Sequence, residues 1–316
     1  MSEKKTIAVV GATGAQGGGL VRAILGDPRH EFAVRAITRK PDSEKARELA
    51  RLGAEVVAAD ADDEASLAKA FAGAHGAFCV TNFWEHFSPE KELAQATNQA
   101  KATKRAGVAH TVWSTLEDTR RHLPLSDPRM PVLMGKYNVP HFDAKGEADQ
   151  AFAEHGGPST CLLTSFYWDN LIYFGMGPKA GADGVAVFNL PMGDRKLPGI
   201  VAADIGACAL GLFKRGHEFI GKTVGIAGEH LTGTQMAASL SRALGREVRY
   251  NAVPFDVYRG LGFPGAEDLG NMFHFNHDFA AEFCAARDVA FSRSLHPGLQ
   301  TFDAWLAANA GRIPLE

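Results

Sequence analysis

The stretch from residue 9 to residue 19, VVGATGAQGGG, constrains the fold of this chain more than any other segment. A short apolar run leads into five glycines, and residues 15–25 then show the periodicity of an amphipathic helix. In a G-x-x-G-x-x-G loop, the first glycine allows a tight turn, the second lets backbone approach a pyrophosphate, and the third lets helix pack against strand. The free N–H groups at the helix N-terminus attract the phosphates. The segment therefore predicts a dinucleotide-binding loop made of Gly11, Thr13, Gly14, Ala15, Gln16 and Gly17.

Strand-like and helical patterns alternate along the first half of the chain, which favours this loop over a glycine-rich turn that binds no ligand. Short apolar runs lie at residues 6–11, 32–38, 54–60, 76–82, 110–115 and 159–165, and helical patterns at 15–25, 43–53, 64–71, 89–105 and 140–157. Strands separated by helices of this kind indicate right-handed βαβ crossovers and a parallel sheet. We predict an α/β fold, with a doubly wound parallel Rossmann sheet and a smaller mixed α/β lobe.

The pattern divides the chain at about residue 165. We expect residues 1–165 to form the cofactor-binding Rossmann domain. Beyond them, glycine and proline recur between residues 175 and 199, and two short amphipathic patterns each end in glycine. We expect residues 166–316 to form a substrate or partner lobe over the carboxyl ends of the strands, with the chain crossing back into the sheet.

The end of the second predicted strand selects the cofactor. An NAD site needs Asp or Glu there to bind the ribose hydroxyls, whereas this strand ends in Arg39 and Lys40. A 2′-phosphate carries about −1.5 to −2 charges, which suits a guanidinium and an ammonium group. Two surface cations are the alternative, but beside the glycine loop the pair predicts NADP(H). Asp60, after the third strand, either lies beside the adenine or caps the next helix.

Composition excludes several other functions. The chain has 33 lysines and arginines against 36 acidic residues, a net charge of −3, so nothing indicates binding to nucleic acid or to an anionic membrane. Its four cysteines lack the paired spacing of a zinc or redox site and predict buried, reduced thiols. His274 and His277 have the spacing of a helix surface and indicate no metal. Without a signal peptide or an apolar run near the ~20 residues of a membrane span, we expect a cytoplasmic protein.

Seven segments along nearly the whole chain carry a resemblance to a known family. They are GATGAQGG, TRKP, GAEVVAADADD, VTNFWE, HFDAKGEAD, FYWDNL and LGFPGAEDLGNMFHF, in this order. With them the chain resembles the NmrA-like family of atypical short-chain dehydrogenase/reductase proteins, especially its NADP-sensing, HSCARG-type branch. The resemblance implies NADP(H) binding, frequent loss of the catalytic tyrosine, and a role as a redox sensor or regulator that docks partner proteins. A regulatory protein partner is therefore expected, and a homodimer is compatible with the sequence.

The resemblance also assigns cofactor contacts to individual positions. It gives the pyrophosphate to Gly11–Gly17 and the 2′-phosphate to Arg39 and Lys40. The remaining implied contacts are Asp60 and Ala61 near adenine, Thr81, Asn82 and Phe83 after the fourth strand, Lys145 at the nicotinamide ribose, and Tyr167, Trp168, Asp169 and Asn170 at the nicotinamide end. One position departs from the family pattern, because Ala94 stands where a cofactor-contacting lysine is expected, with Lys91 one turn away.

The catalytic residues of a short-chain dehydrogenase are only partly present. Such enzymes use Tyr-x-x-x-Lys on a helix, where i, i+4 spacing places both side chains on one face and the tyrosine acts as an acid. Here the register reads HFDAK, so His141 replaces the tyrosine and Lys145 remains. Ser114, ending the fifth strand, has the place of the substrate-orienting serine.

These residues leave two functions open. An imidazole can relay a proton, so His141 with Lys145 and Ser114 is compatible with an NADPH-dependent reductase of a small carbonyl, quinone or enone substrate. Alternatively, His141 is a vestigial residue with a packing role. The missing tyrosine favours the redox sensor or regulator. The segment FYWDNL is either an aromatic substrate wall or part of the core.

Overall fold

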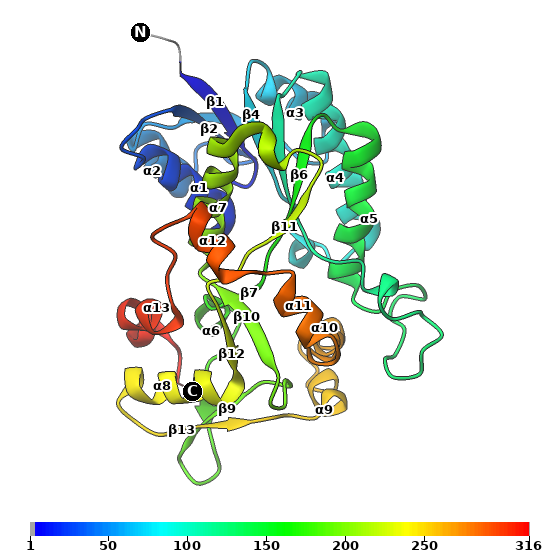
Figure 1. The fold of residues 1–316 in the computed structure, drawn as a ribbon, viewed down its shortest axis with the longest axis vertical. Coiled ribbons are helices and arrows are strands. Elements are labelled where there is room, and N and C mark those ends of the chain that lie inside the picture. Colours follow the sequence, from blue (N-terminus) through cyan, green and yellow to red (C-terminus); the bar gives the residue numbers. More distant parts are fainter. Residues whose placement is uncertain (1–3, 316) are drawn as a thin grey trace.

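A computed structural model of the chain describes residues 4–315. Seven parallel strands form the main sheet, in the order β11-β6-β5-β4-β1-β2-β3 (Figure 1). They are β1 (Lys5–Val9), β2 (Phe32–Thr38), β3 (Glu55–Ala58), β4 (Gly76–Cys79), β5 (His110–Thr115), β6 (Ser159–Leu163) and β11 (Thr223–Gly225). The prediction of a doubly wound parallel Rossmann sheet is confirmed.

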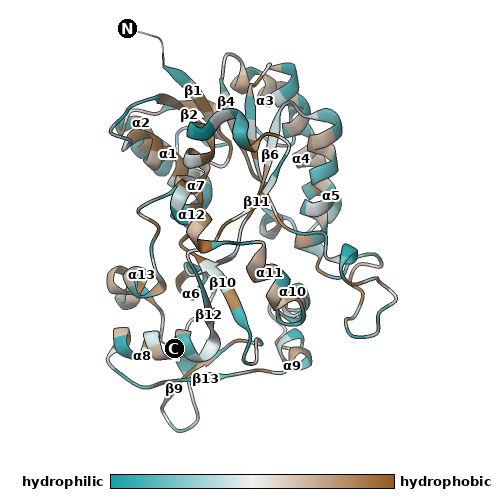
Figure 2. Ribbon diagram, in the orientation of Figure 1, coloured by the Kyte–Doolittle hydropathy of each residue, from teal (hydrophilic) through white to brown (hydrophobic). Residues whose placement is uncertain are grey.

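Helices cover both faces of this sheet. They are α1 (Ala15–Leu25), α2 (Glu44–Arg51), α3 (Glu64–Phe71), α4 (Pro89–Arg105), α5 (Pro140–His155) and α7 (Ala202–Arg215), with the short helices η1 (Phe83–Glu85), η2 (Thr119–Arg121) and η3 (Gly216–Phe219). Side chains alternate along β1, so Ile7 and Val9 pack with α1 and α7, whereas Ala8 and Val10 pack on the side of α3, α4 and α5. Figure 2 shows hydrophobic residues along the strands and hydrophilic residues recurring along the outer helices α3, α4 and α5.

Local capping signals explain where several of these helices begin. The side chains of Ser43, Asp63 and Ser88 each accept a hydrogen bond from a backbone N–H in the first turn of α2, α3 and α4. Proline follows Ser88 at the first helical position, where its missing N–H costs nothing. The helix boundaries predicted in the first half therefore agree closely with the structure.

The lobe contains two three-stranded sheets and a set of short helices. Its strands are β7 (Phe166–Tyr167), β8 (Lys179–Ala180), β9 (Ala186–Asn189), β10 (Lys196–Ile200), β12 (Glu229–Thr232) and β13 (Val248–Asn251), paired in the orders β12-β10-β7 and β13-β9-β8. Its helices are α6 (Asn170–Tyr173), α8 (Gly233–Leu244), α9 (Phe255–Arg259), α10 (Ala266–Asp278), α11 (Ala280–Ala285), α13 (Phe302–Asn309) and η4 (Ala310–Arg312). The remaining helix, α12 (Val289–Leu295), packs on α7 beside the main sheet.

The second half of the chain also completes the first. β11 pairs with β6 at the edge of the main sheet, and α7 packs against α1. Two glycines make this helix contact close, because a Cβ on Gly206 would clash with the backbone of Gly19 and Leu20. Ile205 and Cys208 of α7 are fully buried beneath α1. The Rossmann sheet and the lobe are thus built from interleaved parts of the chain.

Candidate functional site

The glycine loop between β1 and α1 leaves the start of α1 accessible to a ligand. Gly11 has a φ of 64°, a left-handed conformation that favours glycine. A Cβ on Gly17 would clash with the carbonyl oxygen of Gly11, so only glycine lets α1 pack this closely on the loop. Gly14 is the N-cap residue and provides no side-chain acceptor. The N–H groups of the first turn, at the positive end of the helix dipole, are therefore available to an anion.

A cleft of about 820 Å³ extends from this loop across the carboxyl ends of the strands to the lobe. It is lined by most of the residues singled out in the sequence: Gly11, Thr13, Gly14, Ala15, Gln16, Gly17, Arg39, Lys40, Asp60, Ala61, Thr81, Asn82, Phe83, Ser114, His141, Lys145, Tyr167 and Asn170. The structure thus brings these separate motifs into one continuous site.

Trp168 and Asp169 differ from that expectation and lie outside the cleft. Trp168 is 1% exposed and packs against Phe302 in the lobe core. The Asp169 carboxylate accepts a hydrogen bond from the backbone N–H of Ala202, at the start of α7. Side chains of FYWDNL point in different directions, so the segment contributes both to the cleft wall and to the core.

Glu85 is a partner of Arg39 that the sequence did not reveal. The Arg39 guanidinium donates to Glu85 Oε1 over 2.5 Å, and both side chains are about half exposed. This hydrogen bond raises the pKa of Arg39. Lys40 and Lys45 line the same cleft, so its cationic end suits a phosphate group.

The structure shows which aspartate caps α3 and where Ala94 and Lys91 lie on α4. Asp63, not Asp60, caps α3, while Asp60 lines the cleft. Ala94 is exposed on α4, and Lys91 pairs with Asp62 over 3.1 Å. Neither Ala94 nor Lys91 belongs to the residues lining the cleft within 4–315.

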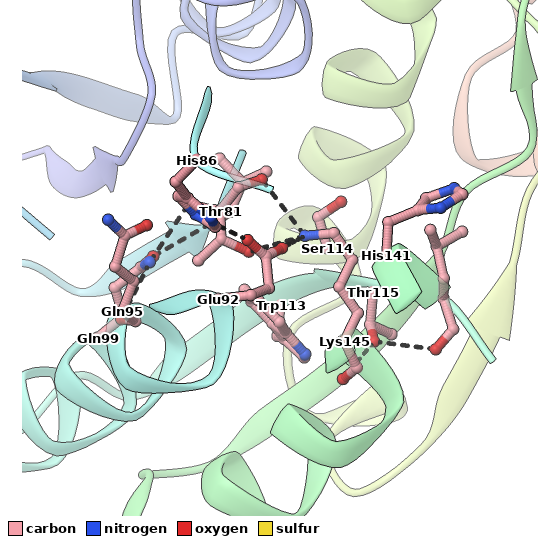
Figure 3. A network of polar contacts seen from close by, with 12 residues as sticks. Thr81, His86, Glu92, Gln95, Gln99, Trp113, Ser114, Thr115, His141 and Lys145 are labelled. Carbon is pink, nitrogen blue, oxygen red and sulfur yellow. Dashed lines mark hydrogen bonds and ion pairs between the residues drawn. The ribbon is translucent and has the colours of Figure 1, made fainter. Parts of the chain in front are cut away.

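Lys145 lies in a buried polar network (Figure 3). Its Nζ is 2.8 Å from Glu92 Oε1 and donates to Thr81 Oγ1 over 2.7 Å. The Thr81 hydroxyl in turn donates to Glu92 Oε1 over 2.6 Å. Glu92 is completely buried, so its carboxylate compensates the ammonium charge in the interior. This network fixes Lys145 at the cleft wall. Glu92 is therefore also a functional candidate, which the sequence did not indicate because α4 is rich in polar residues.

Gln16 connects the glycine loop to the far side of the cleft. The Ser114 hydroxyl donates to Gln16 Oε1 over 2.7 Å, and Gln16 Nε2 donates to the Tyr167 hydroxyl over 2.6 Å. Burial raises the pKa of Tyr167. Because its proton is given to Gln16, Ser114 can offer a ligand only the lone pairs of its oxygen.

The imidazole of His141 is held by Asp268, which lies 127 residues later in the chain. His141 Nδ1 is 2.6 Å from Asp268 Oδ1, and the His141 backbone N–H donates to Asp268 Oδ2 over 3.1 Å. The Trp84 ring packs against the imidazole, with centroids 4.7 Å apart. With Nδ1–H donated to the carboxylate, Nε2 is the nitrogen left for the cleft, where it has no hydrogen-bond partner among residues 4–315.

The lobe contributes a different kind of wall to the cleft. In the described chain, every lining residue from Thr164 onward is uncharged. Most are apolar, including Phe166, Leu269, Met272 and Phe283. The charged lining residues all come from the Rossmann side. The cleft is therefore divided into a charged half and a largely apolar half.

The other groups noted in the sequence are two histidines and the four cysteines. His274 is 8% exposed and stacks on Phe255 with centroids 4.0 Å apart, so the expectation that it lies on a helix surface is wrong. Within residues 4–315, no group of three or more His, Cys, Asp or Glu side chains is arranged to hold a metal ion. Cys79 and Cys208 are buried as expected, whereas Cys161 and Cys284 are half-buried, and all four are free thiols. No helix of the described chain has the length and apolar character needed to cross a membrane.

Comparison with known proteins assigns the chain to a family. The model of the NmrA-like family matches residues 3–306. The chain belongs to the NmrA-like family. One relative, the NmrA-like family domain-containing oxidoreductase FrzB of Cladobotryum sp., is 29% identical over 303 residues, which cover 88% of this chain and 86% of FrzB. Another, the NAD(P)H azoreductase of Xenophilus azovorans, is 32% identical over 264 residues, covering 82% of each chain.

Solved structures of NmrA, a negative transcriptional regulator, share this NmrA-like fold. NmrA in complex with NADP is 26% identical with a TM-score of 0.77, and the match covers 97% of this chain and 95% of NmrA. NmrA in complex with NAD is 25% identical with a TM-score of 0.78 over the same shares of the two chains. The family therefore includes both named oxidoreductases and a named regulator.

Proposed function

We propose that this NmrA-like protein is an NADP(H)-dependent reductase of a small carbonyl, quinone or enone substrate, with His141 as proton donor. The observation that carries the proposal is the His141–Asp268 pair, which joins α5 on the Rossmann side to α10 of the lobe and leaves Nε2 to the cleft. A residue with only a packing role needs no carboxylate on Nδ1 and no access of Nε2 to a cleft. The names of FrzB and of the azoreductase agree with an oxidoreductase activity.

The residues of the charged half fit NADP(H). The sheet order reverses between β1 and β4, and a dinucleotide binds across the crevice at such a switch point. The α1 N-terminus would hold the pyrophosphate, and Arg39 with Lys40 would hold the 2′-phosphate. The adenosine half would then lie toward β2 and β3, and the nicotinamide half toward Ser114, His141 and Lys145. The bound cofactor would supply a hydride there.

The chain's own residues would serve the proton half of the reaction. Asp268 fixes the His141 ring, so that a proton on Nε2 is aimed into the cleft for the substrate oxygen. Lys145, held by Glu92 and Thr81, keeps a positive charge near the same region. The apolar side chains of the lobe would reduce the amount of water around a bound substrate.

A redox sensor is the second candidate, favoured by a connection between the cationic end of the cleft and the lobe. Glu85, paired with Arg39, directly follows Trp84, and Trp84 contacts both His141 and the start of α10. A Cβ on Gly265, the N-cap residue of α10, would lie 2.8 Å from the Trp84 ring. If a 2′-phosphate displaced Glu85 from Arg39, Glu85 and the adjacent Trp84 could move, and Trp84 contacts the start of α10 in the lobe.

The two candidates are separated by turnover. Purified protein with NADPH should oxidise the cofactor when ketones, aldehydes, quinones and enones are added in turn, followed at the absorbance of NADPH. NADPH binding without turnover on any of them would reject the reductase. If hydrogen exchange of α10 then slowed with NADP⁺ but not with NAD⁺, the sensor would be supported instead.

Replacing Arg39 by alanine tests the cofactor preference. The variant should lose about 1.5 kcal/mol of NADP⁺ binding, roughly tenfold, because charge-assisted hydrogen bonds to the 2′-phosphate are lost at a half-exposed site. Its affinity for NAD⁺ should change little. The measurement is a calorimetric titration of both cofactors. Arg22→Ala is the matched control, since Arg22 is equally exposed and pairs with Glu48 on α2. Equal affinities of the wild type for NADP⁺ and NAD⁺ would contradict the preference.

A further inference from the structure

Two buried polar side chains in the cleft have no partner in the described protein. Asn276 Oδ1 and Ser165 Oγ are inaccessible to solvent and make no hydrogen bond to any group in residues 4–315. Both residues line the cleft, although Asn276 is only 3% and Ser165 only 7% exposed. Burying a polar group without a partner destabilises a folded protein, so such groups indicate a ligand or an ordered water.

The surroundings of Asn276 are apolar and suited to a ring. Leu269, Met272 and Asn276 follow one another on α10 at i, i+3 and i+7, so the same helix face presents all three to the cleft. Phe283 of α11 lines the same wall and lies nearly parallel to Phe142, with an interplanar angle of 17°. Flat aromatic faces and a thioether favour contact with a planar apolar molecule.

The charge distribution restricts the molecule further. In the part of the chain that the structure describes, no lining residue from Thr164 onward could neutralise a charged ligand. A carboxylate or an ammonium group would lose its hydration there without compensation. The molecule must therefore be neutral where it contacts the lobe.

We propose that Asn276 and Ser165 form a subsite for a neutral hydroxylated aromatic molecule, whose O–H donates to Asn276 Oδ1 while its ring packs on the apolar lobe wall. An amide oxygen can only accept, so the ligand must bring the donor. The Ser165 hydroxyl can donate to the lone pairs of the same ligand oxygen. This inference rests on the proposed function in taking the molecule to be the reductase's second ligand, bound beside NADP(H).

The test measures binding of two probes, of which only one can donate a hydrogen bond. They are 2-naphthol, which is neutral at pH 7, and 2-methoxynaphthalene, which has no O–H. The wild type should bind 2-naphthol about tenfold more tightly, the effect of one hydrogen bond to an otherwise unpaired buried acceptor. In Asn276→Leu, which keeps the shape but removes the acceptor, this difference should disappear. Glu267→Leu, at an exposed position of the same helix, should retain it.

Each outcome decides the proposal. Equal binding of the two probes by the wild type, expected if Asn276 only holds a water, would overturn it, as would no detectable binding of either probe. A difference unchanged in Asn276→Leu would also overturn it.

Saturating NADP⁺ should leave 2-naphthol binding intact, so competition between them would assign Asn276 to the cofactor instead. Asn276-dependent binding without any NADPH oxidation would reject the reductase but support the subsite. Turnover without Asn276-dependent binding would reject the subsite but support the reductase. Ser165→Ala provides an independent variant in which both probes should lose affinity to the same extent.

Discussion

His141→Phe should lower substrate-dependent NADPH oxidation by roughly 10²–10⁴-fold, the usual contribution of a general acid. Phenylalanine keeps the contacts with Trp84 and Phe142 but removes the only group of this residue that can carry a proton into the cleft. Because the loss concerns proton transfer, kcat should fall while the affinity for NADPH stays nearly unchanged. Steady-state kinetics on whichever substrate of the panel is active, with a separate NADPH titration, provide the measurement.

Asp268→Asn distinguishes a proton donor from a packing residue. The amide keeps the size of the side chain but no longer fixes the imidazole with a carboxylate, so kcat should fall while the affinity for NADPH stays nearly unchanged. If His141 only packs, Asp268→Asn should leave kcat at the wild-type value. Wild-type turnover in His141→Phe or in Asp268→Asn would contradict the assignment of His141 as the acid.

Arg287→Met should cost about 3–5 kcal/mol of unfolding free energy, the effect of removing one partner of a buried ion pair. The Arg287 side chain is fully buried, and its two terminal nitrogens donate to the two oxygens of Glu117 over 2.6 and 2.9 Å. Its Nε donates to the carbonyl of Thr164 over 2.8 Å, and its guanidinium lies 3.6 Å above the Phe283 ring centre. These contacts join the lobe to the ends of β5 and β6, so chemical denaturation should show a lower midpoint.

The control for Arg287 is an arginine in an exposed pair. Arg242 donates to Asp303, and both side chains are 63% exposed, so Arg242→Met should cost less than about 1 kcal/mol. Glu117→Gln together with Arg287→Met should be less destabilised than Arg287→Met alone, because no uncompensated carboxylate remains. If the two arginine variants had similar midpoints, the ion pair of Arg287 would not hold the lobe to the sheet.

The first half of the fold could be predicted because its signals are local. The boundaries of α1 and α4 follow from the glycine loop, the Ser88 cap and Pro89, all within a few residues of the helix that they begin. The glycine loop, which lines one end of the cleft, is likewise defined by seven consecutive residues. Periodicity, caps and turn glycines act over one or two turns, and such signals can be read from one sequence.

The lobe and the partners of the site residues could not be predicted, because they depend on distant pairings. Several lobe strands have only two to four residues, too few to show an alternating pattern. Asp268 reaches His141 from 127 residues away, and no feature of GAEDLG indicates that role. Likewise, no local feature of α4 indicates that Glu92 pairs with Lys145. Trp168 illustrates the limit within a motif, since FYWDNL gives the residue types but not which side chains face the cleft.

The close glycine contact between α1 and α7 has a consequence for how the protein is made. The apolar face of α1 stays uncovered until residues 202–215 have left the ribosome, since Ile205 and Cys208 fill the core beneath it. The edge of β6 likewise stays unpaired until β11 is synthesised. Gly211 of α7 packs against the backbone of Leu295, which is synthesised later still. The nascent nucleotide-binding half therefore emerges with exposed apolar surface and an unpaired strand edge, both of which promote aggregation. A fragment ending at residue 165 should accumulate in inclusion bodies or on chaperones, because it lacks α7, β11 and Leu295.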